Sequence, residues 1–185
     1  MVPLARRVEI ALSKSKIFLM LFGALIFVSI GIWFVIAPPV IKNPFWGNPT
    51  KIAIVGYAAI LFFGLCAFFI LRKLSDNKPG LIIDDKGLID NSSGLSAGYV
   101  PWSDIEEISV IEIQGQQLIM LHVINPQKYI DSQKNALKRK GMELNHKMYR
   151  TPIFITTNGL KISFDKLFAL LTDQLKESRH LPLSQ

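Results

Sequence analysis

Cysteine is nearly absent from this sequence, and the single residue, Cys66, lies inside a long apolar run. One cysteine cannot form a disulfide within the chain, and a lone thiol in an apolar segment gives no indication of redox chemistry. Charge is the second absence, because residues 17–37 and 52–71 contain no Asp, Glu, Lys, Arg or His. These two uncharged runs, more than the average composition, indicate the class of protein.

The residue patterns of common enzyme classes are also missing. The sequence has no glycine-rich phosphate loop, no G-x-S-x-G motif and no HExxH motif. Its histidines have no second ligand at metal-binding spacing: His122, His146 and His180. The adjacent pairs Asp84–Asp85 and Glu106–Glu107 fall in predicted strands and turns, where neighbouring side chains point to opposite faces. We therefore expect no catalysis, no metal and no cofactor.

The two uncharged runs each have about the 20 residues with which an α-helix crosses roughly 30 Å of hydrocarbon. We therefore predict transmembrane helices at 17–37 and 52–71. A pair of buried core helices is one alternative, but so small a domain could not enclose two wholly apolar helices. A cleaved signal peptide is another alternative for the first run. The run is longer than the apolar region of a signal peptide, and it ends in the bulky residues Trp33, Phe34 and Val35, where a cleavage site needs small residues.

The distribution of basic residues predicts the topology. Four Lys/Arg precede the first run, and Arg72, Lys73 and Lys78 follow the second, whereas the connecting segment 38–51 contains two. The positive-inside rule then places residues 1–16 and the domain after the second helix in the cytoplasm, with 38–51 as a short external loop. Only +2 of the net charge of +7 belongs to residues 72–185 (15 Lys/Arg against 13 Asp/Glu), so nucleic acid is not an expected partner.

The segment before the first run has an amphipathic pattern. Leu4, Val8, Ala11 and Leu12 follow a period near 3.6, which favours a short helix on the inner leaflet. A frayed basic tail is the alternative, because about 15 residues are marginal for an isolated helix.

Small residues recur along both uncharged runs and favour close packing of the two helices with each other over a homodimer contact. They are Gly23, Gly31, Ala53, Gly56, Gly64 and Ala67. A homo-oligomer is thus possible but not indicated. Turn-forming residues at 75–80 separate the second run from the next domain, so we assign 72–80 to a linker.

Residues 81–180 are predicted to form an α+β domain. The apolar runs 81–84 and 88–90 flank one turn, and the runs 105–113 and 117–124 flank Gln114-Gly115-Gln116, so the first half predicts a β meander. A second hairpin is predicted at 152–162, with Asn158-Gly159 as its turn. Ser163 is a candidate N-cap of a closing helix with apolar residues at helical spacing: Phe164, Leu167, Phe168, Leu171 and Leu175.

One helix is predicted between these hairpins, at 126–140. Pro126 can occupy its first turn, and Gly141 ends it. Tyr129, Ile130 and Leu137 lie on one face, which we expect to pack toward the sheet, and lysines lie around the other face.

The stretch Gly98-Tyr99-Val100-Pro101-Trp102-Ser103-Asp104-Ile105, followed by paired strands and a closing amphipathic helix, resembles the bacterial PH-like domains. In that family such a Trp-x-Asp-Ile stretch starts a strand, and a C-terminal helix plugs one end of a bent antiparallel sheet. The whole chain is similar to a group of small two-pass inner-membrane proteins of bacteria. The resemblance implies an α+β membrane protein, a two-helix hairpin followed by a PH-like domain, but no activity. The helix at 126–140 departs from the simple family pattern.

Four residues of this stretch form a motif that we interpret as structural: Pro101, Trp102, Asp104 and Ile105. We expect Trp102 to fill a core or hinge position and Asp104 to bond to the backbone in the turn before its strand.

Charge is unevenly distributed within the domain. Residues 81–125 carry one Lys and seven Asp/Glu, a net charge of −6, whereas residues 126–150 carry seven Lys/Arg and two Asp/Glu, a net charge of +5. The basic segment could contact anionic phospholipid headgroups or an acidic partner, or it could be a solvated face. The candidate contact residues are Lys134, Lys138, Arg139, Lys140, Lys147 and Arg150.

These observations favour a membrane-tethered interaction or regulatory module that recognises a protein, a peptide or a lipid headgroup at the inner leaflet. A membrane-resident immunity protein that neutralises a toxin is one alternative. A lipid-modifying enzyme is another, although the sequence shows no nucleophile, acid or metal site for it.

Overall fold

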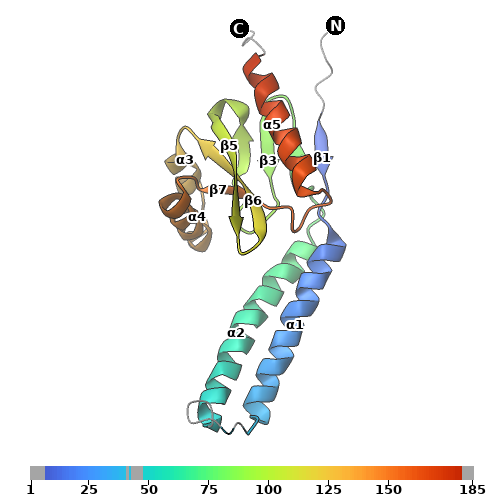
Figure 1. Ribbon diagram of the computed structural model, residues 1–185, viewed down its shortest axis with the longest axis vertical. Helices are drawn as coiled ribbons and strands as arrows, with labels where there is room; N and C mark the ends of the chain where they lie inside the picture. The colour runs from blue at the N-terminus through green and yellow to red at the C-terminus, as the bar shows by residue number, and fades with distance from the viewer. Residues whose placement is uncertain (1–6, 41, 43–47, 181–185) are drawn as a thin grey trace. The chain divides into compact units, whose positions relative to one another are not determined.

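The computed structural model describes residues 7–40, 42 and 48–180, except for the side chain of His180. Two compact units make up the chain: a helical unit, Lys14–Asn77, and a globular unit that combines residues of Met1–Ser13 with those of Lys78–Gln185. The globular unit is therefore discontinuous in sequence. The helical unit is an insertion between its first strand and its remaining elements (Figure 1).

The helical unit consists of α1 (Lys14–Ile36) and α2 (Pro49–Leu74). Asn48 caps α2 by accepting a hydrogen bond from Thr50 N at 2.9 Å, and Pro49 occupies the first turn, where its missing N–H costs nothing. Both helices are long and apolar enough to cross a membrane. Most of their large apolar side chains are exposed, as in Phe18, Phe62 and Leu65, which fits a small membrane protein better than buried core helices.

The two helices approach each other closely where Gly31 of α1 meets Gly56 of α2. A Cβ atom on Gly31 would lie 2.9 Å from Gly56 O, and one on Gly56 would lie 2.7 Å from Gly31 O. Any larger residue would push the backbones apart, so these glycines provide the predicted close packing. Gly23 and Gly64 do not take part, because nothing lies within 4 Å of a Cβ atom built on either.

The globular unit contains a four-stranded antiparallel sheet with the order β1-β2-β3-β4. Its strands are β1 (Val8–Ile10), β2 (Leu81–Ile83), β3 (Gly87–Asp90) and β4 (Gly98–Pro101). Apolar side chains two residues apart, such as Leu81 and Ile83, are fully buried, as the strand period requires. The predicted strands at 81–84 and 88–90 are thus confirmed.

The prediction of an amphipathic helix before the first membrane run is wrong for residues 8–10, and Leu4 lies outside the described residues. Val8–Ile10 form β1, with Ile10 paired to Leu81, and Leu12 forms an isolated antiparallel bridge with Leu160. The period-2 pair Ile10 and Leu12 is buried in the globular unit. Over so few residues a helical and a strand period are hard to distinguish, and the partner strand decides between them.

A second antiparallel sheet has the order β5-β6-β7. It consists of β5 (Ile105–Ile113), β6 (Gln116–Val123) and β7 (Ile153–Ile155). Gln114 and Gly115 join β5 to β6 with φ values of 51° and 76°, as in a type I′ turn, so the predicted hairpin is confirmed.

The second predicted hairpin is wrong in its pairing. β7 pairs with β6, with Ile119 opposite Ile155, while Asn158-Gly159 still forms a turn. The chain beyond that turn pairs with the N-terminal segment instead, through Ser13 N to Gly159 O at 2.7 Å and Lys161 N to Ala11 O at 3.0 Å.

The closing helix α5 (Phe164–His180) is confirmed, and Ser163 O accepts the hydrogen bond from Leu167 N that starts it. It lies against β5 and the 3₁₀ turn η1 (Trp102–Asp104), burying Leu167, Leu171 and Leu175 (Figure 1). Trp102 is buried and its indole Nε1–H donates to Asp84 O at 2.8 Å. The core role that we expected for Trp102 is confirmed. The unit is thus an α+β fold of two antiparallel sheets with a C-terminal helix.

Candidate functional site

The basic segment lies between β6 and β7 and consists of two helices, α3 (Pro126–Asp131) and α4 (Ala136–Tyr149). We call residues 125–150 the α3–α4 insert. The prediction of a single helix ending at Gly141 is wrong. Asn135 Oδ1 accepts hydrogen bonds from Leu137 N at 2.9 Å and Lys138 N at 3.2 Å, so this strong N-cap starts a new helix.

Gly141 lies within α4 and does not end it, because the helix continues to Tyr149 and is capped by Arg150 at φ 64°. A Cβ atom on Gly141 would lie 2.8 Å from Leu95 Cδ2, so the missing side chain leaves room for the loop that contains Leu95. Glycine within a helix costs only about 1 kcal/mol relative to alanine, which tertiary contacts readily offset.

Asp104 holds α3 against the sheet. Its Oδ2 accepts hydrogen bonds from Lys128 Nζ and from Tyr129 OH, both at 2.7 Å. The expectation that the Asp104 side chain bonds backbone in its own turn is therefore wrong, since its partners are side chains of α3. Tyr129 and the neighbouring Ile130 are buried, as predicted.

This cluster shifts two pKa values. The hydrogen bond from the Lys128 ammonium lowers the pKa of Asp104, burial opposes this change, and the Tyr129 hydroxyl adds to the lowering. The pKa of Tyr129 is raised, chiefly by burial and then by the adjacent carboxylate, so the phenol stays protonated and keeps donating. The stability from Asp104 is therefore present above its unfolded pKa, near 3.9, and is lost as pH falls through the lower folded value.

We expect Asp104→Asn to destabilise the globular unit by about 1–2 kcal/mol at neutral pH, because the amide lacks the charge that strengthens both hydrogen bonds. The difference from the unchanged protein should shrink as the pH falls below about 4, where Asp104 of the unfolded chain begins to bind a proton, and should vanish once the pH has fallen through the lower pKa of the folded state. Pulse proteolysis in a urea series, on the full chain in nanodiscs, measures both values. Lys128→Gln is the matched control and should cost less, because the Lys128 side chain is 57% exposed. Equal stability of Asp104→Asn and the unchanged protein at pH 7 would contradict the role of the cluster.

The structure brings the six predicted basic residues onto α4 and its two ends. Lys134 lies in the connection before α4, Lys138, Arg139 and Lys140 lie in its first turns, Lys147 lies in its last turn, and Arg150 is the C-cap residue. All are exposed except Lys138, which is half-buried. Arg139 is 3.7 Å from Glu143, an exposed pair that holds the guanidinium weakly.

The expectation that Leu137 packs toward the sheet is wrong, because its side chain is 68% exposed. Met142 instead supplies the fully buried side chain of α4, and Tyr149 packs edge-on against Phe154 of β7 with ring centroids 5.3 Å apart. The inward face of α4 differs from the predicted one because α4 has its N-cap at Asn135, whereas the predicted helix began after Asn125. Residues before Asn135 therefore do not define the inward face of α4.

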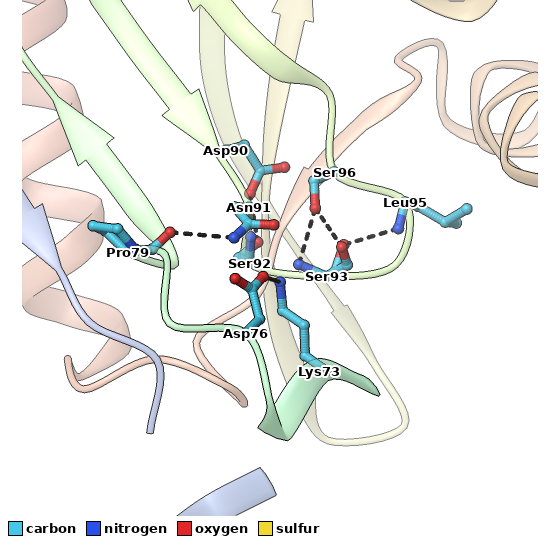
Figure 2. Close-up of polar contacts among 9 residues, drawn as sticks. All are labelled: Lys73, Asp76, Pro79, Asp90, Asn91, Ser92, Ser93, Leu95 and Ser96. Atoms are coloured by element: carbon cyan, nitrogen blue, oxygen red, sulfur yellow. Dashed lines mark hydrogen bonds and ion pairs between the residues drawn. The ribbon is translucent and has the colours of Figure 1, made fainter. Parts of the chain in front are cut away.

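Asp90 is a buried carboxylate that the sequence did not single out. It accepts hydrogen bonds from Ser92 N at 2.8 Å, Ser92 Oγ at 2.6 Å and Ala97 N at 3.1 Å, which fixes the loop between β3 and β4. Figure 2 shows this loop, where Ser96 and Ser93 also bond to each other. Burial raises the pKa of Asp90, and its hydrogen bonds and the charge of Lys138 oppose that rise. Lys138 is therefore tied electrostatically to the fold.

Metal ligands are not gathered anywhere in the part of the chain that the structure describes, where no three His, Cys, Asp or Glu residues form a cluster. His122 Nε2 is 2.8 Å from Ser109 Oγ, across the β5–β6 pair. His146 Nδ1 is buried without a hydrogen-bond partner. The chain matches no protein-family model and has no significant similarity to curated proteins or to solved structures.

Proposed function

We propose that this protein is a membrane-tethered binding module of the bacterial inner membrane. In this proposal the helical unit spans the bilayer, and the globular unit has a PH-like architecture and binds anionic phospholipid headgroups at the cytoplasmic leaflet without catalysing a reaction. The observation that carries it is the concentration of exposed basic side chains on α4 and its ends.

The PH-like assignment is supported by the arrangement of elements. A four-stranded and a three-stranded antiparallel sheet precede a C-terminal helix that lies against β5 and η1. The motif residues Pro101, Trp102, Asp104 and Ile105 lie where the first sheet ends and the second begins. Fold alone does not specify a ligand, so the function has to be argued from the surface.

The topology is supported by the pairing of β1 with β2. These strands precede and follow the helical unit, and antiparallel pairing requires both to be on the same side of any membrane that α1 and α2 cross. Two crossings return the chain to its starting side. The excess of Lys/Arg outside the segment 38–51 then selects the cytoplasm for that side.

Anionic lipid is the favoured ligand because the charge is exposed and the membrane is already attached. Each basic side chain near an anionic leaflet contributes about 1 kcal/mol, and the covalent tether replaces a bimolecular encounter by a local one. Ser13 and Lys14 are adjacent in sequence, so the globular unit stays within reach of the bilayer that holds α1.

We expect the triple substitution Lys134→Gln, Lys140→Gln and Lys147→Gln to abolish docking of α4 on anionic membranes. Three contacts at about 1 kcal/mol each correspond to roughly a hundredfold change in the ratio of docked to undocked protein. The full chain is reconstituted in phosphatidylcholine nanodiscs with and without phosphatidylglycerol, and hydrogen–deuterium exchange of residues 134–150 is compared. Phosphatidylglycerol should slow exchange in the unchanged protein, and high salt should reverse the effect.

The matched control removes three exposed lysines from the end of the domain, with Lys161→Gln, Lys166→Gln and Lys176→Gln. This variant has the same net charge as the test variant but should retain the protection by phosphatidylglycerol. Lys138 and Arg139 are left unchanged, because the first is tied to Asp90 and the second is paired with Glu143. Identical exchange of residues 134–150 in both lipid compositions would overturn the proposed function.

A further inference from the structure

The outward face of α4 carries an apolar stripe between its basic side chains. Leu137, Leu144 and Met148 are 68%, 56% and 59% exposed. Their spacings of seven and four residues place them on one line along the helix. Lys140 and Lys147 each follow a leucine of the stripe by three residues, so they lie beside it.

Most of this stripe is left uncovered by the globular unit, although the loop that contains Leu95 reaches α4 at Gly141, on the same line between Leu137 and Leu144. The core contact of α4 is made from its opposite side, by the fully buried Met142 and by Tyr149 against Phe154. Asn135 and Arg150 cap the helix at its two ends, so the stripe lies on a preformed surface. Large apolar side chains aligned on an exposed face indicate a surface that is covered in the functional state.

We propose that α4 lies in the plane of the membrane interface, with Leu137, Leu144 and Met148 inserted among the lipid chains and Lys140 and Lys147 at the headgroups. An amphipathic helix with lysines flanking an apolar stripe is the pattern that anchors proteins parallel to an anionic bilayer. This inference rests on the proposed function and deepens it, because it adds hydrophobic insertion to headgroup binding.

The charge of the same face disfavours a second copy of this chain as its occupant. A symmetric dimer places identical surfaces together, so Lys140 and Lys147 of two copies would face each other around the stripe. An anionic leaflet would instead pair its headgroups with these lysines and bury the apolar side chains among its acyl chains. The tether through α1 and α2 keeps that leaflet close in the proposed topology.

The test places an environment-sensitive fluorophore on the stripe of the full chain. Cys66 is the single cysteine, so Cys66→Ser gives a background in which Leu144→Cys can be labelled specifically. Glu112→Cys on the acidic strand β5 is the matched control site, since it is also exposed and lies outside the basic α3–α4 insert. Both labelled proteins are reconstituted in nanodiscs containing phosphatidylglycerol, with and without lipids that carry a nitroxide quencher on the acyl chain.

We expect the label at position 144 to shift to the blue and to be quenched by the acyl-chain nitroxide, while the label at position 112 is unaffected. In a parallel series labelled at position 148 through Met148→Cys, Leu144→Asp should lower the quenched fraction by a factor of roughly ten or more, because it loses the burial of a leucine. Leu144→Met should retain it. These results would support insertion.

Two results would overturn the inference. An unquenched label at position 144, with exchange of residues 134–150 still slowed by phosphatidylglycerol, would leave headgroup binding in place and remove insertion. A blue shift without lipid quenching that grows with the number of chains per disc would assign the stripe to a protein contact. Quenching that is equal in pure phosphatidylcholine would instead support insertion and count against anionic recognition, so the two proposals fail separately.

Discussion

A chain in which residues 14–77 are replaced by a short Gly/Ser linker is expected to fold as a water-soluble domain, whereas residues 78–185 alone are not. The reason is that β1 belongs to the globular unit although it precedes the helical unit. Ile10 is paired to Leu81 in an antiparallel register, so Ser13 and Lys78 continue from neighbouring strand ends. A linker of about four residues, the usual length of a hairpin connection, should therefore replace the helices.

Removing β1 should cost much of the stability of the globular unit, because residues 8–13 are hydrogen-bonded to β2 on one side and to the segment 159–161 on the other. Ile10 and Leu12 are each 6% exposed, and burying such a side chain is worth about 1.5–3 kcal/mol. The backbone bonds from Gly80 N to Ile10 O, Ser13 N to Gly159 O and Lys161 N to Ala11 O would also be lost. Together these losses approach the total stability of a typical domain, about 5–15 kcal/mol.

Circular dichroism and amide exchange of the two soluble proteins measure this result. Ile10→Asp in the linked chain is the control, since it keeps the linker and the length but places a charge in the core. That variant should behave like the fragment 78–185. A cooperative unfolding transition of equal midpoint in the fragment and the linked chain would show that β1 is dispensable.

Trp102→Ala should destabilise the globular unit by about 3–5 kcal/mol, the usual cost of emptying a large aromatic site in a core. The side chain is 4% exposed, and its indole N–H donates to Asp84 O. The substitution therefore leaves a cavity and an unpaired carbonyl in the turn between β2 and β3. Urea-dependent pulse proteolysis of the full chain in nanodiscs reports the midpoint without relying on tryptophan fluorescence.

Trp102→Phe separates the two contributions, because it keeps most of the apolar volume and removes the N–H that donates the hydrogen bond to Asp84 O. Its loss should be about 1–2 kcal/mol, well below that of alanine. If alanine left the midpoint unchanged while the protection of α4 by phosphatidylglycerol disappeared, Trp102 would belong to the binding surface and not to the core.

The candidate surface was predicted in its charge but not in its geometry. The six basic residues could be found because charge is a local property of the sequence. The apolar stripe was not predicted because a single helix was expected to begin at Pro126. α4 begins ten residues later, so Leu137 lies on its exposed face and not on the inward face of the predicted helix. The spacing of Leu137, Leu144 and Met148 was a signal for the stripe, but the burial of Met142 and the contact of Tyr149 with Phe154 are needed to show which side of α4 faces inward.

The local features of this chain follow from short-range physics, which is why they could be predicted. Uncharged runs of about 20 residues require helices that satisfy their own backbone, as in α1 and α2. Gln114-Gly115 favours a tight turn through its positive φ angles, and the apolar spacing of α5 requires a partner on one side. Contacts between residues far apart in sequence are determined only by the tertiary structure. Val8–Ile10 form a strand because β2 offers hydrogen bonds on one side, and residues 11–13 are bonded on the other side to the segment 159–161. Asp104 bonds to α3 because the fold brings Lys128 and Tyr129 next to it.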